Sequence, residues 1–246
     1  MDGVRPVTHA LRTRAAAGVL RPGAVVTGCS AAVLWGVDLA TAADDVELTL
    51  PPRAHPVRMP GVRARRALLD PRHVCPRRGV LVTDPDLTAV EVAGMLPLDE
   101  AVVAVDRLTV YGPADLVRVR ALASAGTGRN CRRARLACSL ADGRAESPQE
   151  TRVRLLRLRS GLPVPIAQFQ VPRPGRRPLP LDFAWPEHRL ALELDGRWHG
   201  EPDQLAKDRR RLNLLGDAGW RIVFATAADV HRPAELIARL SALLGA

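Results

Sequence analysis

The spacing of hydrophobic and polar residues divides the chain into two regions that differ in the periodicity of their apolar positions. Up to about residue 145, most stretches place apolar residues three or four positions apart, which is the spacing of an amphipathic helix. Residues 44–50 alternate instead, and residues 79–83 form a short apolar run, so both are predicted strands. We therefore expect a mostly helical first domain, residues 1–145, with a small sheet. Its helices are predicted at residues 8–20, from Ser30 onward, and at residues 83–96, 97–112, 113–126 and 129–143.

The second region, residues 146–246, predicts the element order αβββαβα. Its helices are expected at residues 147–160, 201–219 and 232–245, and its strands at residues 166–172, 179–185, 189–196 and 220–226. The sequence "PEHR" at residues 186–189 is short enough to join the second and third strands as an antiparallel hairpin. The chain is thus expected to be an α/β protein of the α+β kind, with two domains.

Three acidic residues fall on one face of this predicted hairpin. Strand side chains alternate, so Glu193 and Asp195 lie on the face opposite to the leucines of residues 190–194. The hairpin register places Asp182 directly across from Glu193, and opposed like charges destabilise a sheet. A hard cation such as Mg²⁺ or Mn²⁺ would remove that repulsion, and without it the loss of Asp182 should not lower stability. The alternative is that these acids are solvated and held by nearby arginines.

Three further side chains are candidates for catalysis. Glu150 lies three residues after Ser147, so it either closes a capping box or points over the sheet toward the cation. His199 follows the predicted strand, and it either serves as a general base, orients a water or is simply exposed. Lys207 is the only lysine among 36 basic residues, and a lysine can lose its proton where an arginine cannot. Its presence is therefore either functional or a matter of chance.

Composition and charge point to a polyanionic partner. The net charge of +10 and the pI near 11.0 favour nucleic acid, and DNA above all. No run of about 18 apolar residues is present, and the N-terminus lacks the apolar segment of a signal peptide, so we expect a cytoplasmic protein with no membrane contact. The four cysteines lack zinc-site spacing and are expected to be buried small hydrophobes. Whether the chain binds a partner protein or a second copy stays open.

The second region resembles a nuclease family. The strings "LDFAWPEHRLALELDGRWH", "KDRRRLN" and "GWRIVFATAADV" resemble the actinobacterial domain of unknown function 559, which is related to very-short-patch-repair endonucleases of the PD-(D/E)XK superfamily. The resemblance implies that Asp182 and Glu193 bind the metal, with Glu150 nearby. The nuclease pattern has a lysine where this chain has Asp195. Asp195 is therefore an additional metal ligand, or the role of the lysine has moved, for example to Lys207, or activity is lost.

The first region resembles a different family. The strings "LRPGAVVTGCSAAVLWGVDL" and "VELTLP" are similar to the middle of AbiEi-type antitoxin proteins, in which a winged helix usually precedes this point. Here the winged helix is expected to be missing. Two functional hypotheses follow: a metal-dependent DNA endonuclease that hydrolyses phosphodiester bonds, or a non-catalytic, antitoxin-like DNA-binding regulator with a degenerate nuclease fold.

Overall fold

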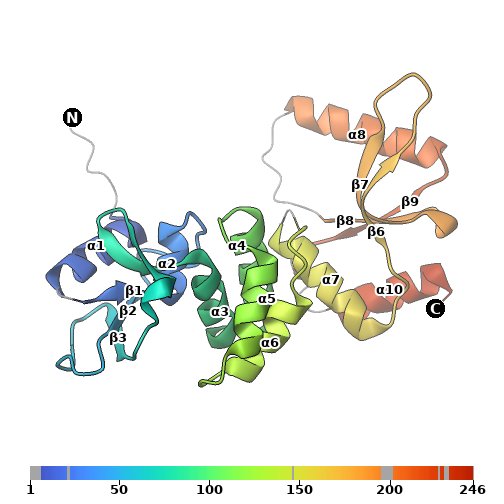
Figure 1. Cartoon of the computed structure of the whole chain (residues 1–246). Helices are drawn as coiled ribbons and strands as arrows, with labels where there is room; N and C mark the ends of the chain where they lie inside the picture. The colour runs from blue at the N-terminus through green and yellow to red at the C-terminus, as the bar shows by residue number, and fades with distance from the viewer. Residues whose placement is uncertain are drawn as a thin grey trace, which may run out of the picture. The chain divides into compact units, whose positions relative to one another are not determined.

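The computed structural model describes residues 7–20, 23–145, 147–194, 202–226, 228–229 and 233–245, with the side chains of residues 202–208 outside this description. The fold is of the mixed α+β kind, as the sequence predicts, and the chain divides into two compact units, Met1–Pro148 and Gln149–Ala246 (Figure 1). The division falls in the first turn of a helix. Among the described residues, no helix is long and apolar enough to cross a membrane.

The first unit contains a mixed five-stranded sheet with the strand order β3-β2-β1-β5-β4. The pairs β1–β5 and β2–β3 are parallel, whereas β1–β2 and β4–β5 are antiparallel. The strands are β1 (Val25–Val26), β2 (Val46–Leu50), β3 (Val62–Arg66), β4 (Val74–Arg77) and β5 (Val80–Thr83).

The core of this unit lies between the sheet and its first two helices. Val26, Leu48 and Val82 of the sheet pack against Ala17 and Leu34, and all five are buried. The later helices pack against one another, α3 against α4, α5 and α6 (Figure 1). The helical elements are α1 (His9–Val19), α2 (Gly28–Leu34), the short 3₁₀ turn η1 (Pro71–His73), α3 (Pro85–Met95), α4 (Leu98–Val110), α5 (Leu116–Ala125) and α6 (Cys131–Leu140).

Several boundaries in the first unit differ from the sequence-based prediction. Helix α2 begins at Gly28 rather than at Ser30, and α5 begins after Asp115, whose side chain caps the helix by accepting the Arg118 N–H. Strands β1, β3 and β4 were not predicted at all. Strands β3 and β4 are the two edges of the sheet, and their residues are half-exposed or exposed, so they carry no apolar pattern to recognise.

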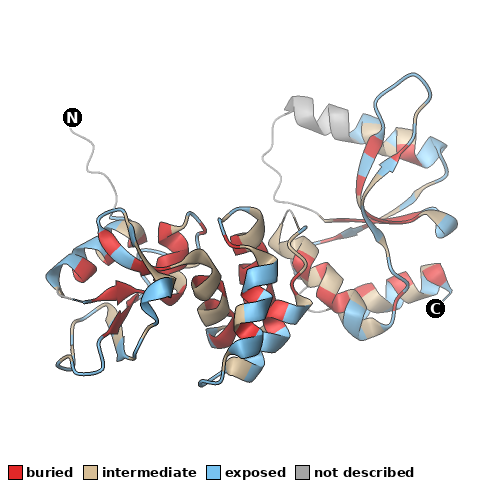
Figure 2. Ribbon diagram, viewed as in Figure 1, coloured by how far each residue is buried: buried red, intermediate tan, exposed pale blue. Residues whose placement is uncertain are grey.

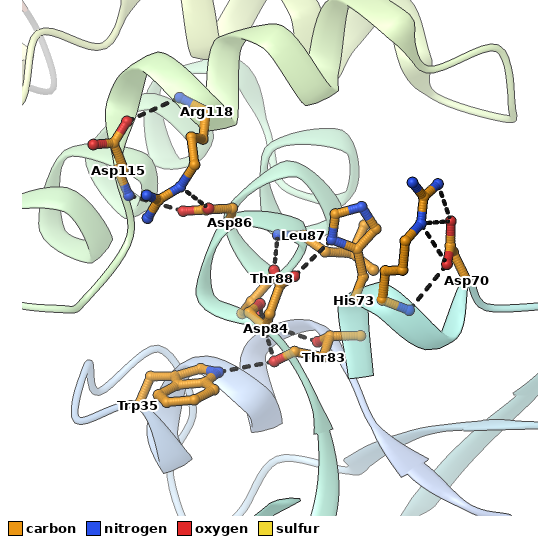
Figure 3. A network of polar contacts seen from close by, with 11 residues as sticks. Trp35, Asp70, His73, Thr83, Asp84, Asp86, Leu87, Thr88, Asp115 and Arg118 are labelled. Carbon is orange, nitrogen blue, oxygen red and sulfur yellow. Dashed lines mark hydrogen bonds and ion pairs between the residues drawn. The ribbon is translucent and has the colours of Figure 1, made fainter. Parts of the chain in front are cut away.

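A network of polar contacts fixes the start of α3 (Figure 3). The Asp84 carboxylate accepts the Leu87 N–H at 2.7 Å, which caps the helix, and its other oxygen lies 2.6 Å from Nδ1 of His73. In the first turn of the helix, Asp86 accepts from Nε of Arg118 at 2.6 Å. The network therefore ties η1, α3 and α5 together at one end of the helix.

The second unit has the predicted order αβββαβα. Its sheet has the strand order β6-β7-β8-β9, antiparallel except for the parallel pair β8–β9. The elements are α7 (Pro148–Ser160), β6 (Ile166–Val171), β7 (Leu179–Trp185), the 3₁₀ turn η2 (Pro186–His188), β8 (Leu190–Leu194), α8 (Pro202–Asp217), β9 (Arg221–Ala225) and α10 (Ala234–Leu244).

Helices cover both faces of this second sheet. On one face, Phe183 and Leu192 pack against side chains of α7 and α10, such as Leu240. On the other face, Ala184 and Ala191 belong to the cluster that contains Leu215 of α8. Figure 1 shows α8 on one side of the sheet with α7 and α10 on the other, and Figure 2 shows the central strands as buried. Strand β8 is thus covered from both sides, which leaves little water for any polar side chain it carries.

This packing makes a testable prediction about the second unit. Leu192 is fully buried in the sheet, so Leu192→Ala should lower the free energy of unfolding by about 2–5 kcal/mol, the usual range for a large-to-small change in a core. Leu158 of α7 is 48% exposed, and Leu158→Ala should change stability by no more than about 0.5 kcal/mol. Urea unfolding of both variants measures the contrast, and equal losses would contradict the assigned packing.

Candidate acidic site on the second sheet

The hairpin formed by β7 and β8 brings two predicted acidic residues onto neighbouring strands. The strands are antiparallel, and Phe183 pairs with Leu192. The paired register ends there, and Asp182 and Glu193 are the next residues along the two strands. At this point an oxygen of Asp182 accepts the backbone N–H of Leu194 at 2.9 Å. Asp182 therefore supports the end of β8 with a hydrogen bond, in addition to any ligand it binds.

Glu193 is an ion pair partner of Arg211, a residue of α8. Glu193 is only 8% exposed, and its Oε2 accepts from Nη2 of Arg211 at 2.6 Å. The other terminal nitrogen, Nη1, donates to the carbonyl oxygen of Pro180 in β7 at 2.7 Å. Arg211 thus joins α8 to both strands of the hairpin. The alternative of solvated acids held by arginines is thus wrong about solvation for Glu193, although an arginine does pair with one of its oxygens.

The second oxygen of Glu193 has a different environment. Oε1 is buried and has no hydrogen-bond partner among the described residues. A buried acceptor without a partner costs about 1–3 kcal/mol, so native proteins seldom leave one in this state. The geometry therefore leaves an oxygen available to a ligand on the strand that pairs with that of Asp182. An oxygen acceptor of this kind suits a hard divalent cation.

The described residues alone do not complete a metal site. They contain no group of three or more His, Cys, Asp or Glu side chains placed to hold a metal ion. Asp182 and Glu193 provide two carboxylates, and a third protein ligand has to come from elsewhere. Asp195, the residue that follows β8 in sequence, lies outside the described residues.

The other predicted site residues are placed only in part. Glu150 lies in the first turn of α7, a helix whose buried side chains pack on the sheet face opposite to α8. His199 lies outside the described residues. The backbone of Lys207 is in α8, and its side chain is outside the description.

Arg211 was missed by the sequence analysis, although a signal for it exists. It is the last of three consecutive arginines, and composition alone does not distinguish them. Arg211 lies one helical turn before the fully buried Leu215, so the two residues share the face of α8 that covers the sheet. Arg209 and Arg210 are exposed. Helix phase would therefore have identified Arg211 as the arginine directed to the strands.

A pair of acids in the first unit, the buried Glu47 and the half-buried Glu91, was also missed. Glu47 of β2 accepts from the Cys29 N–H and from Arg63, each at 2.6 Å. Glu91 of α3 accepts the first backbone N–H of α2 at 3.2 Å and pairs with Arg65. Burial raises the pKa of Glu91 despite that nearby guanidinium. All four oxygens of this pair have partners, so the arrangement is structural and links α2, α3 and the edge strand β3.

The cysteines agree only in part with the expectation that they are buried. Cys138 is buried, whereas Cys29, Cys75 and Cys131 are half-buried, and all four are free thiols. Burial, together with the Glu47 carboxylate, raises the pKa of the Cys29 thiol to about 12. Burial likewise raises the pKa of Cys138 to about 11. These two thiols are therefore protonated at neutral pH and poorly nucleophilic.

The chain is similar to mycobacterial proteins whose names give no function. No family model matches the sequence. The uncharacterized proteins MT2308 and Rv2248 of Mycobacterium tuberculosis (strains CDC 1551 / Oshkosh and ATCC 25618 / H37Rv) are each 37% identical to this chain over 166 residues, which is 66% of this chain. The chain spans 61% of the length of these curated relatives. The predicted resemblances to nuclease and antitoxin families stay predictions.

A solved structure gives a weaker likeness. The crystal structure of the Rv2827c protein from Mycobacterium tuberculosis has 19% sequence identity and a TM-score of 0.37. The match covers 68% of this chain and 65% of that one. A likeness this distant carries no argument about function.

The raised pKa of Glu91 makes a prediction about pH. Folding favours the protonated form of this acid, so its contribution to stability is present below its ordinary pKa of 4.5 and is lost as the pH rises through the folded-state pKa. Glu91→Gln is neutral at every pH and should lack this loss. The wild type should therefore become less stable relative to Glu91→Gln between about pH 4 and pH 7. Urea unfolding at both pH values measures the change, and a constant difference would disprove the assignment.

Proposed function

We propose that this chain is a metal-dependent DNA endonuclease that hydrolyses phosphodiester bonds, with Mg²⁺ or Mn²⁺ held by Asp182 and Glu193. The observation that carries the proposal is the buried Glu193 Oε1, which has no hydrogen-bond partner among the described residues and belongs to a strand paired with that of Asp182. A divalent cation supplies the missing partner and also offsets the repulsion between two neighbouring carboxylates. A cytoplasmic location belongs to the same proposal.

Each residue of the site has a distinct task under this proposal. Asp182 and Glu193 hold the cation, which when bound polarises a phosphoryl oxygen and lowers the pKa of a water. Asp195 follows β8 directly and is the proposed third ligand. His199 is the proposed base or water-orienting group, and Lys207 the proposed positive charge near the phosphate. Glu150 was also predicted for the site, but α7 packs on the sheet face opposite to α8, so it is given no task at the cation.

The charge of the chain supports a DNA substrate. A net charge of +10 attracts the phosphate backbone and increases the rate of encounter with it. This electrostatic attraction is independent of base sequence. It therefore supports binding to DNA in general and assigns no target site.

Two observations favour the second candidate function, a non-catalytic DNA-binding regulator. Arg211 already neutralises Oε2 of Glu193, and the chain has Asp195 where the nuclease pattern has a lysine. If the ion pair with Arg211 is permanent, the acids are structural and the protein acts by binding alone. Cleavage assays distinguish the two functions.

The nuclease proposal makes a prediction about catalysis. Asp182→Asn should abolish nicking of supercoiled plasmid in Mn²⁺, because the variant loses a charged metal ligand but keeps an oxygen that accepts the Leu194 N–H. The earlier expectation that losing Asp182 costs no stability is revised, because Asp182→Ala removes this hydrogen bond and should cost about 0.5–1.5 kcal/mol. Glu187→Gln, an exposed acid in the turn of the same hairpin, should nick like the wild type.

Two outcomes of this assay would count against the proposal. Equal nicking by the wild type and Asp182→Asn would mean that the activity arises elsewhere. Absence of nicking by the wild type on single-stranded, duplex and mismatched DNA would favour the regulator.

A separate prediction concerns DNA binding. The logarithm of the association constant should fall linearly with the logarithm of the salt concentration, with a slope of about −0.9 for each phosphate neutralised on duplex DNA. Fluorescence anisotropy with a labelled duplex over a range of salt concentrations measures this slope. An affinity that does not change with salt would argue against any polyanionic partner.

A further inference from the structure

We propose that Arg211 is a removable countercharge of the acidic site: it neutralises Glu193 in the absence of metal, is displaced when a divalent cation binds, and then donates to a phosphate oxygen of the DNA. The inference rests on the proposed function, because it assumes a cation at Asp182 and Glu193. It adds a mechanism by which metal binding at that site would strengthen DNA binding.

The contacts of Arg211 place it in direct competition with a cation. Its Nη2 lies 2.6 Å from Oε2 of Glu193, so the guanidinium occupies one side of the carboxylate while Oε1 stays without a partner among the described residues. A cation bound to Oε1 would lie beside the guanidinium, and two positive charges that share one buried carboxylate repel each other. Metal binding therefore weakens the ion pair, and the ion pair weakens metal binding by the same factor.

The position of Arg211 allows it to move without unfolding of α8. Its side chain is 27% exposed, in contrast to the 10% of the Glu193 side chain. The arginine therefore has a path to solvent, whereas the glutamate stays buried. The hydrogen bond from Nη1 goes to the Pro180 carbonyl, an uncharged acceptor. It is therefore weaker than a hydrogen bond to a carboxylate.

A displaced Arg211 would lie close to the site where the scissile phosphate binds. Guanidinium groups bind phosphate oxygens through two parallel hydrogen bonds, so the released side chain has a ready partner once DNA is present. Metal binding would thus create one additional phosphate contact. DNA affinity should therefore depend more steeply on salt in Mn²⁺ than in its absence.

The first experiment measures Mn²⁺ binding by isothermal titration calorimetry in the absence of DNA. Arg211→Gln removes the competing charge and should bind Mn²⁺ about tenfold more tightly than the wild type, or better, given the strength of charge-assisted hydrogen bonds. Arg210→Gln is the matched control, because it removes the same charge from an exposed position of the same helix. Unchanged or weaker binding by Arg211→Gln, relative to Arg210→Gln, would overturn the inference.

A second variant shows whether any change in Mn²⁺ binding arises from misfolding of Arg211→Gln. Arg211→Lys keeps a positive charge but makes at most one of the two contacts at a time, so its Mn²⁺ affinity should lie between those of the wild type and Arg211→Gln. The rise in Tm caused by Mn²⁺ should follow the same order and provides a readout independent of calorimetry. A reversed order in both readouts would show that Arg211 assists metal binding.

The results separate this inference from the proposed function. If Mn²⁺ binds the wild type, fails to bind Asp182→Asn and is unaffected by Arg211→Gln, the metal site stands and the countercharge does not. If no variant binds Mn²⁺, including Arg211→Gln, both proposals fail.

The phosphate contact is tested by the salt dependence of DNA binding in Mn²⁺ and in EDTA. In Mn²⁺ the slope for the wild type should be steeper than that for Arg211→Gln by about 0.9, which corresponds to one phosphate. In EDTA the two slopes should agree. Equal slopes in Mn²⁺ would show that the displaced side chain does not contact the DNA.

Discussion

The burial of one carboxylate in the central strand β8 is the constraint around which the second unit is arranged. Glu193 lies between a sheet and α8, where a charged group is costly unless it is fully paired. Arg211 forms an ion pair with one of its oxygens. It also donates a hydrogen bond to the Pro180 carbonyl and so connects α8 to β7. Removing either partner of such a pair typically costs about 3–5 kcal/mol. A fold that needed only stability would be served as well by an apolar pair, so the acid requires another explanation.

The acids of the two sheets differ in how completely they are paired. Glu47 and Glu91 of the first unit use every carboxylate oxygen on arginines and backbone N–H groups, so they have no capacity for a ligand. Glu193 is also buried and has an arginine of its own, yet one oxygen has no partner among the described residues. Asp182 on the paired strand supplies a second carboxylate. This difference, rather than the presence of acids as such, marks the second sheet as the candidate site.

The sequence predicts those helices and strands that bury an apolar face, because burial imposes a periodic pattern of hydrophobic residues. Hydrophobic periodicity correctly located most of the elements with a buried face. They are strands β2, β5 and β7–β9 and helices α3, α4, α6, α7 and α8. Strand β3 reads Val-Arg-Ala-Arg-Arg and lies at a sheet edge, where only one side needs pairing and no pattern is imposed. The register of the hairpin was predictable from the length of its turn, and with it the pairing of Phe183 with Leu192. The Arg211 ion pair was not, because it joins residues 18 positions apart through the rotation of α8 against the sheet.

The most direct test of the central claim is a crystal structure of the protein soaked in Mn²⁺, examined by anomalous diffraction. The account predicts a Mn²⁺ peak in coordination distance, about 2.0–2.3 Å, of Glu193 Oε1 and an oxygen of Asp182, with the Arg211 guanidinium withdrawn from Glu193. A structure without a peak at these carboxylates, and with Arg211 still bound to Glu193 at saturating Mn²⁺, would contradict it.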